Sequence, residues 1–196
     1  MQKRVFIIHG WEGYPENNWF PWLKSKLEEK GFEIILPTMP NAEEPNKDEW
    51  VSHLVKIVKN PNKETYFVGH SLGCQAILRY LETLSDEVKV GGVICVAGSF
   101  ILKGLSAADE EVARPWLETA IDFNKVKKHT DKFVAILSEN DEFVPLEESA
   151  NSYREKLGAR IIVEHNKGHF NDDAGIKELP SALDAVLEIA GENQGG

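Results

Sequence analysis

Short apolar segments recur along this chain and alternate with segments of helical periodicity. The apolar segments are rich in Val, Ile and Phe and span residues 5–8, 32–36, 65–68, 93–96, 133–137 and 160–163. Because their apolar residues are mostly consecutive rather than alternating with polar ones, we expect strands that are buried on both faces. Their alternation with helices predicts a compact parallel six-stranded sheet with helices on both faces, which is a three-layer α/β fold.

The helical segments carry apolar residues at spacings of three and four, which place those residues on one face of a helix. The four stripes are Val51, Leu54, Val55 and Val58; Cys74, Ile77, Leu78 and Leu81; Leu146, Ala150, Tyr153 and Leu157; and Leu183, Val186, Leu187 and Ala190. Pro145 and Gly158 are predicted to mark the start and the end of the third helix.

The length of 196 residues and the hydrophobic content of 42% suit a single domain, residues 1–196, with a sizeable core. The least regular segment, residues 98–118, is too long for a simple connection and is expected to form a small cap. The Gly-rich residues 191–196 are expected to form a flexible tail.

Charge and composition argue against nucleic acid as a partner and against insertion into a membrane. A formal net charge of −10 argues against nucleic acid, because phosphate binding needs a basic face. Cys74 and Cys95 lie within apolar patterns and are expected to be reduced core residues. Neither a signal segment nor an apolar run long enough for membrane insertion is recognisable, so we expect a cytoplasmic protein, either a monomer or a small homo-oligomer.

The most informative motif is Gly69-His70-Ser71-Leu72-Gly73, a G-x-S-x-G sequence between a predicted strand and a predicted helix. This context is typical of a nucleophile elbow, in which a sharp, strained turn presents the serine hydroxyl above the edge of the sheet. The flanking glycines keep side chains from colliding where strand and helix nearly touch. We interpret Ser71 as a nucleophile; the alternative is a plain strand-to-helix turn.

A serine nucleophile needs a base that a carboxylate orients, and in hydrolases with this elbow the chain order is Ser, Asp or Glu, His. Two histidines follow the last predicted strand, His165 and His169. His169 follows Gly168, which lets the chain turn inward over the sheet, and we favour it as the base. His165 lies at the strand end, where a structural role is more common.

The other four histidines are expected to have different roles. His9 precedes a glycine at the end of the first strand and is expected to shape that loop. His70 lies inside the elbow with its side chain committed beside the nucleophile. His53 and His129 lie on helical or helix-end patterns and are expected to be exposed to solvent.

Asp141 is the favoured acid, because it follows the fifth strand and lies in the loop just before the next helix. Glu139 and Glu142 flank it and are interpreted as solvated side chains. Asp172 and Asp173 are expected to cap the final helix.

Acyl transfer also needs two donors directed at the developing oxyanion. The backbone N–H of Leu72, which follows the nucleophile, is one candidate. The backbone N–H of Trp11, in the loop after the first strand, is the other. The aromatic residues Trp11, Trp116, Phe143 and Phe170 are candidate walls of a substrate pocket, and the alternative is that several of them belong to the core.

Over nearly its whole length the chain resembles the family of small serine hydrolases grouped with retinoblastoma-binding protein nine and YdeN. The matching motifs are residues 8–11, 19–23, 39–40, 69–71, 114–116 and 168–170, together with the loop of Asp141. The resemblance implies an α/β-hydrolase fold reduced to its parallel strands, with Ser71, Asp141 and His169 as the catalytic triad.

These observations predict a serine hydrolase, carboxylesterase-like, that cleaves a small ester, thioester or activated amide through an acyl-enzyme intermediate. Its partner would be a small-molecule acyl substrate. No metal and no cofactor is expected, because the sequence has no cluster with ligand spacing and no nucleotide-binding motif. Two alternatives stay open: an acyltransferase with the same triad, and a non-catalytic interaction module on a hydrolase scaffold.

Overall fold

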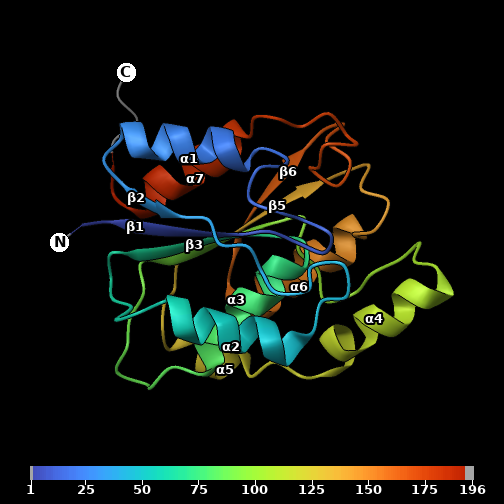
Figure 1. Ribbon diagram of the computed structural model, residues 1–196, viewed down its shortest axis with the longest axis horizontal. Helices are drawn as coiled ribbons and strands as arrows, with labels where there is room; N and C mark the ends of the chain where they lie inside the picture. Colours follow the sequence, from blue (N-terminus) through green and yellow to red (C-terminus); the bar gives the residue numbers. More distant parts are fainter. Residues whose placement is uncertain (1, 193–196) are drawn as a thin grey trace.

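The computed structural model describes residues 2–192, and its centre is a parallel sheet of six strands (Figure 1). The strand order across the sheet is β2-β1-β3-β4-β5-β6, and every neighbouring pair is parallel. The strands are β1 (Arg4–Ile8), β2 (Glu33–Ile35), β3 (Thr65–His70), β4 (Gly92–Val96), β5 (Phe133–Ser138) and β6 (Arg160–Glu164). The predicted three-layer parallel α/β fold is therefore confirmed.

Helices cover both faces of this sheet (Figure 1). Within the described residues they are α1 (Phe20–Glu29), α2 (Lys47–Ile57), α3 (Leu72–Glu82), α4 (Ala107–Glu118), α5 (Phe123–Lys127), α6 (Leu146–Leu157) and α7 (Pro180–Ile189). Helices α1 and α7 lie on one face, whereas α2, α3, α5 and α6 lie on the other. Helix α4 extends away from the sheet beyond α2 and α6.

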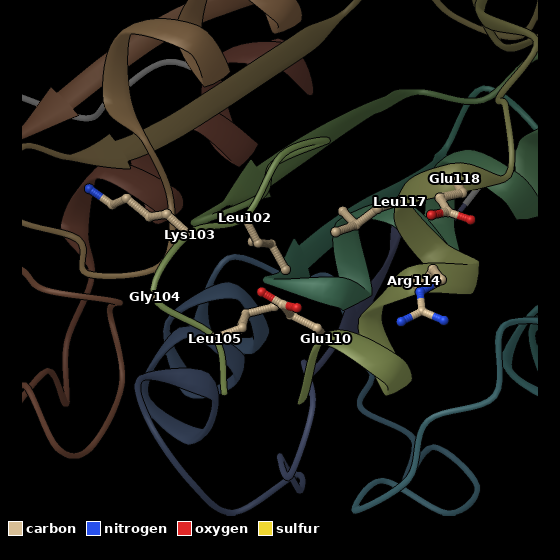
Figure 2. A pocket seen from close by; sticks show the side chains of 8 residues that line it. All are labelled: Leu102, Lys103, Gly104, Leu105, Glu110, Arg114, Leu117 and Glu118. Carbon is tan, nitrogen blue, oxygen red and sulfur yellow. The ribbon is translucent and has the colours of Figure 1, made fainter. Parts of the chain in front are cut away.

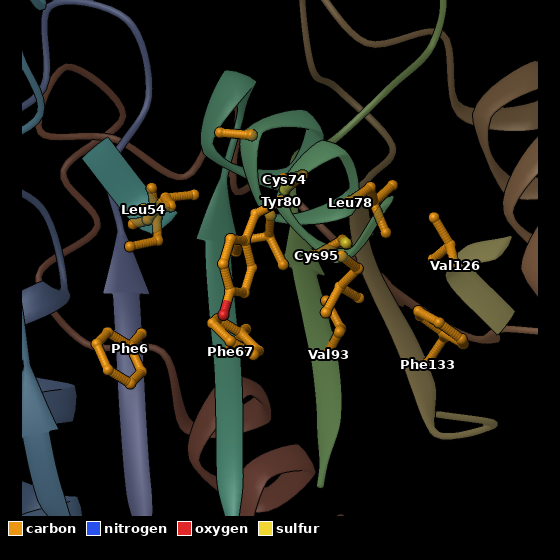
Figure 3. Close-up of a cluster of buried hydrophobic side chains, with 14 of the residues drawn as sticks. Phe6, Leu54, Phe67, Cys74, Leu78, Tyr80, Val93, Cys95, Val126 and Phe133 are labelled. Atoms are coloured by element: carbon orange, nitrogen blue, oxygen red, sulfur yellow. The ribbon is translucent and has the colours of Figure 1, made fainter. Parts of the chain in front are cut away.

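Each face of the sheet has its own hydrophobic core. Figure 3 shows the core beneath α3, where Phe67 and Val93 of the sheet face Cys74 and Leu78 of the helix. The opposite core joins Val68 and other strand residues to the apolar sides of α1 and α7. Successive residues of a strand point into opposite cores, so this fold requires strands whose consecutive residues are apolar.

Some sequence-based expectations for the helices need correction. The buried face of α2 is centred on Trp50 and Leu54, and Val55 is half exposed although its spacing placed it on the apolar stripe. His129, expected at the surface, is fully buried and bonds through Nδ1 to the carbonyl oxygen of Val88 at 2.9 Å. This bond ties the ring to the segment that precedes β4.

The predicted cap segment, residues 98–118, consists of a loop followed by α4. A capping box between Ser106 and Asp109 begins the helix. The indole of Trp116 is buried and donates to the carbonyl oxygen of Pro45 at 2.9 Å, which anchors the end of α4 to the segment before α2. Of the predicted tail, residues 193–196 lie outside the described residues. Among residues 2–192 no helix combines the length and apolar character that a membrane crossing requires.

Candidate active site

Ser71 occupies a strained backbone conformation between β3 and α3. Its φ and ψ angles are 52° and −123°, a region that non-glycine residues rarely adopt. Its own N–H donates to the carbonyl oxygen of Val96 on the neighbouring strand at 2.9 Å. The surrounding structure thus holds Ser71 in this conformation at the end of its strand.

Two glycines allow the tight packing around Ser71. A Cβ atom at Gly10 would lie 2.7 Å from the Cβ of Ser71. A Cβ atom at Gly73 would lie 2.3 Å from the carbonyl oxygen of Ile8. Both distances are shorter than any tolerable contact, so the loop after β1 and the first turn of α3 can only approach each other through glycine.

Ser71, His169 and Asp141 form one continuous series of hydrogen bonds. The Nε2 atom of His169 lies 3.0 Å from the Oγ atom of Ser71. The Nδ1 atom of the same ring lies 2.9 Å from Oδ2 and 3.1 Å from Oδ1 of Asp141. Since a carboxylate only accepts, Nδ1 carries the ring proton, which leaves the lone pair of Nε2 directed at the serine hydroxyl.

Asp141 is fixed by its own loop as well as by His169. Its Oδ1 atom accepts hydrogen bonds from the backbone N–H groups of Phe143 at 2.9 Å and Val144 at 3.1 Å. This turn follows β5 directly and leads into α6. The Asp141 side chain is fully buried, whereas 11% of the His169 side chain is exposed.

The loop of His169 is held by its main chain. His70 Nε2 donates to the carbonyl oxygen of His169 at 2.8 Å, and the indole of Trp19 donates to that of Phe170 at 3.0 Å. The N–H of Gly168 donates to Oδ1 of Asn140 at 2.9 Å. Sequence reasoning placed His70 beside the nucleophile but missed the roles of Trp19, which it noted only as part of a motif of the resembling family, and of Asn140.

A second long-range contact joins the loop after β1 to the same region. Asn18 and Asp172 exchange two hydrogen bonds, each backbone N–H donating to the other side chain, at 2.7 Å and 2.9 Å. The prediction that Asp172 and Asp173 cap the final helix is wrong. Helix α7 begins only at Pro180, and its N-cap residue is Leu179.

The rival histidine, His165, is not directed at Ser71. Its side chain is 74% exposed, and its Nδ1 atom pairs with Oε2 of Glu139 at 2.7 Å. His9 shapes the loop after β1, as expected: its Nδ1 donates to the carbonyl oxygen of Gly10, and its Nε2 accepts from the N–H of Met39 at 2.9 Å.

The two predicted oxyanion donors belong to the two segments that meet at Ser71, the start of α3 and the loop after β1. Leu72 is the first residue of α3, where backbone N–H groups have no partner within the helix. Trp11 follows Gly10, where an added Cβ atom would lie 2.7 Å from the Cβ of Ser71. Within residues 2–192 neither N–H donates to a protein acceptor.

The four aromatic candidates divide into two groups. The Phe143 ring meets the His169 ring edge-on, with centroids 5.2 Å apart, and Phe143 and Trp11 are both partly exposed. By contrast, Trp116 and Phe170 are buried and pack within the two hydrophobic cores. Trp116 and Phe170 are therefore core residues, which was the alternative to a role in the pocket wall.

A pocket of about 250 Å³ lies between α4 and the loop that precedes it (Figure 2). Leu102 and Leu105 of the loop and Leu117 of α4 give it apolar walls, and Glu110 and Arg114 of α4 add a carboxylate and a guanidinium group to its lining. The loop is joined to the turn of Asp141, because the N–H of Lys103 donates to the carbonyl oxygen of Phe143 at 2.9 Å.

The electrostatic environment of the site keeps His70 uncharged. The pKa of His70 is lowered from 6.5 to about 3, chiefly because the ring is buried and also because a nearby positive charge on His169 disfavours its protonation. Burial also lowers the pKa of His9. A neutral His70 can still donate through Nε2, so its hydrogen bond to the loop of His169 persists at neutral pH.

This shift predicts acid destabilisation. The unfolded chain protonates His70 below about pH 6.5 but the folded chain only near pH 3, so the stability present above pH 6.5 is lost as the pH falls through that window. From pH 7 to pH 5 we expect this residue alone to cost about 2 kcal/mol. Urea unfolding at the two pH values measures it. His70→Gln keeps an N–H donor, and its free energy of unfolding should fall by about 2 kcal/mol less between pH 7 and pH 5 than that of the unaltered protein. The control His53→Gln should show the full decrease. An equal decrease in both variants would contradict the prediction.

Comparisons with known proteins agree on one family. The model of the family described as "Serine hydrolase" matches residues 5–188. The chain is 35% identical over 187 residues to YdeN of Bacillus subtilis strain 168, covering 95% of each chain. It is 24% identical over 157 residues to the serine hydrolase RBBP9 of Rattus norvegicus, covering 80% of each. The crystal structure of the B. subtilis ydeN gene product superposes with a TM-score of 0.89 at 31% identity, covering 97% of this chain and 100% of that one.

Proposed function

This chain belongs to the serine hydrolase family, and on that premise we propose that it cleaves a small ester, thioester or activated amide with Ser71, His169 and Asp141 as a catalytic triad. The observation that carries the proposal is the hydrogen-bond series from Asp141 through His169 to Ser71, in which each contact measures about 3 Å. Enzymes with this fold act on many different substrates, so the reaction has to be inferred from the residues of the site.

In the first half of the reaction, the Oγ atom of Ser71 attacks the carbonyl carbon of the substrate while Nε2 of His169 takes the hydroxyl proton. Asp141 stabilises the imidazolium that forms. Collapse of the tetrahedral intermediate breaks the bond to the leaving group, which receives the proton from His169. The products of this half are an alcohol, thiol or amine and an acyl ester on Ser71.

In the second half, water takes the place of the leaving group. His169 removes a proton from the water, the oxygen attacks the acyl carbon, and the bond to Ser71 breaks as Oγ recovers its proton. The carboxylic acid then departs. A serine that is held in a strained turn by its neighbours needs little rearrangement between these steps.

The oxyanion of both intermediates would be stabilised by the backbone N–H groups of Trp11 and Leu72. Their lack of a protein acceptor within the described part of the chain supports this role. The first turn of α3 adds the positive end of a helix dipole beside Ser71.

The bound substrate would rest against Phe143 and Trp11, the two partly exposed aromatic candidates. We propose that residues 98–118 act as a cap over one side of this site. The loop of the cap is bonded to the turn of Asp141, and the pocket of about 250 Å³ lies between that loop and α4. Its leucine side chains suit an apolar acyl or aryl group.

Covalent labelling tests the proposal most directly. A fluorophosphonate probe is expected to modify Ser71 alone among the serines, because only an activated hydroxyl displaces fluoride at an appreciable rate. Intact-mass measurement and peptide mapping would identify the adduct. Labelling should vanish in Ser71→Ala and persist in Ser52→Ala, a control on the exposed side of α2. An adduct on another serine, or none on folded protein, would favour the non-catalytic interaction module.

A further inference from the structure

A second pocket, of about 200 Å³, shares Leu117 of α4 with the one in Figure 2 and carries two cationic side chains, Arg79 of α3 and Lys156 of α6. Its other lining residues come from α3, from the loop after β4, and from α4, α5 and the segment that connects them. Arg79 is eight residues beyond Ser71 along the chain, which corresponds to about 12 Å along a helix axis. None of Ser71, Asp141 and His169 lines this pocket, which is therefore separate from the proposed catalytic site.

Arg79 is buried, with only 6% of its surface exposed, and its hydrogen bonds are unevenly distributed. Its Nη2 atom donates to the carbonyl oxygens of Trp116 at 2.7 Å and Thr119 at 2.6 Å, and to Oε1 of Gln75 at 3.3 Å. Its Nε atom is buried without an acceptor in the described part of the chain. All three bonds involve one nitrogen of a group that has five N–H donors, so most of its donor capacity is unused.

No carboxylate lines this pocket, although acidic residues outnumber basic ones in the chain by 32 to 22. Within residues 2–192 neither Arg79 nor Lys156 forms a salt bridge. Glu82 and Asp48 act on Arg79 only through space, and they oppose the lowering of its pKa by burial. A buried cation without a counter-ion is unfavourable, and an anionic ligand would supply the missing charge.

Lys156 adds a second positive charge to the same pocket and lies beside two aromatic rings that also line it. Its Nζ atom lies 4.8 Å from the centre of the Phe100 ring and 5.2 Å from that of the Phe123 ring. The two rings meet edge-to-face with centroids 5.2 Å apart. Aromatic rings beside a lysine and a buried guanidinium suit a ligand that combines a flat apolar body with a negative charge.

We propose that this pocket binds a small organic carboxylate with a flat apolar body. Arg79 would bind the carboxylate, because the planar guanidinium matches that group in geometry and charge. Lys156 would add a second positive charge, and the rings of Phe100 and Phe123 would contact the apolar body. The ligand would lie beside the carbonyl groups at the end of α4 that Arg79 already holds.

Calorimetric titration of the full-length protein with benzoate tests this proposal, with benzyl alcohol as the uncharged counterpart and inorganic sulfate as the anion without an apolar body. We expect saturable binding of benzoate and at least tenfold weaker binding of the other two compounds. Equal binding of benzyl alcohol would show a merely apolar pocket, and tighter binding of sulfate would show an inorganic anion site. Either result would overturn the proposal, as would no binding of benzoate.

Two variants locate the binding site. Arg79→Gln is expected to abolish benzoate binding. Lys156→Gln is a change near the surface that the fold should tolerate. It is expected to weaken benzoate binding about tenfold, because one favourable charge interaction is lost. The control Arg154→Gln removes a charge from the exposed side of the same helix and should leave affinity unchanged. If Lys156→Gln binds benzoate as tightly as this control, the ligand lies elsewhere and the proposal fails.

Discussion

Replacing His169 by alanine is expected to lower kcat for an ester substrate by about 10,000-fold to 1,000,000-fold. The ring is the one base within hydrogen-bond distance of the Ser71 hydroxyl among the described residues, at 3.0 Å. Without it, the serine must lose its proton to water, and the leaving group must depart without a proton donor. Hydrolysis of a series of p-nitrophenyl esters measures the effect, with the melting temperature as a check on folding.

The matched control is His165→Ala, four residues earlier in the same loop. The His165 side chain is mostly exposed and pairs with Glu139, so its loss should change kcat by less than about threefold, as is usual for a surface ion pair. If His165→Ala abolished turnover and His169→Ala did not, the role of the base would pass to His165.

Asp141→Asn is expected to lower kcat by about 10,000-fold while leaving the fold intact. An asparagine can still accept from the N–H groups of Phe143 and Val144 through its amide oxygen. Its NH₂ group then faces Nδ1 of His169, where a donor favours the tautomer with the proton on Nε2. That tautomer cannot accept the proton of Ser71, and the imidazolium loses its neighbouring negative charge.

Stopped-flow or steady-state assays with Asp141→Asn, compared with its unfolding transition, separate a chemical effect from a structural one. Glu139→Gln and Glu142→Gln are suitable controls, because both residues are more exposed neighbours of the same turn. Normal turnover in Asp141→Asn, together with a large loss in one of these controls, would show that another carboxylate orients the base.

The strands can be predicted from sequence because a buried parallel strand has few alternatives to a run of apolar residues. The run at residues 133–137, for example, differs from β5 (Phe133–Ser138) by one residue. Helix α1 is absent from the predicted helices, although Phe20, Leu23 and Leu27 form its buried face. Spacing alone also misplaces Val55, because the position of the neighbouring core decides which side of a helix is buried.

The residues proposed for catalysis can be found because each follows the end of a parallel strand, and such strand ends share one edge of the sheet. The contacts that hold these residues in place cannot be predicted from the strand ends. Asn18 and Asp172, for instance, are 154 residues apart in sequence and meet only after the sheet has formed. Nothing in the local sequence of Asp172 distinguishes this role from the helix cap that its position predicts.

The attachment of the His169 loop has a consequence for sequence variation. The contacts to His70, Trp19 and Asn140 all bind the backbone of residues 168–170 and leave the side chain at position 169 uninvolved. Position 169 can therefore lose or exchange its side chain while the loop keeps its path. In a lineage that abandoned hydrolysis, the scaffold would survive the loss of its base, and a different chemistry could arise there by a single substitution.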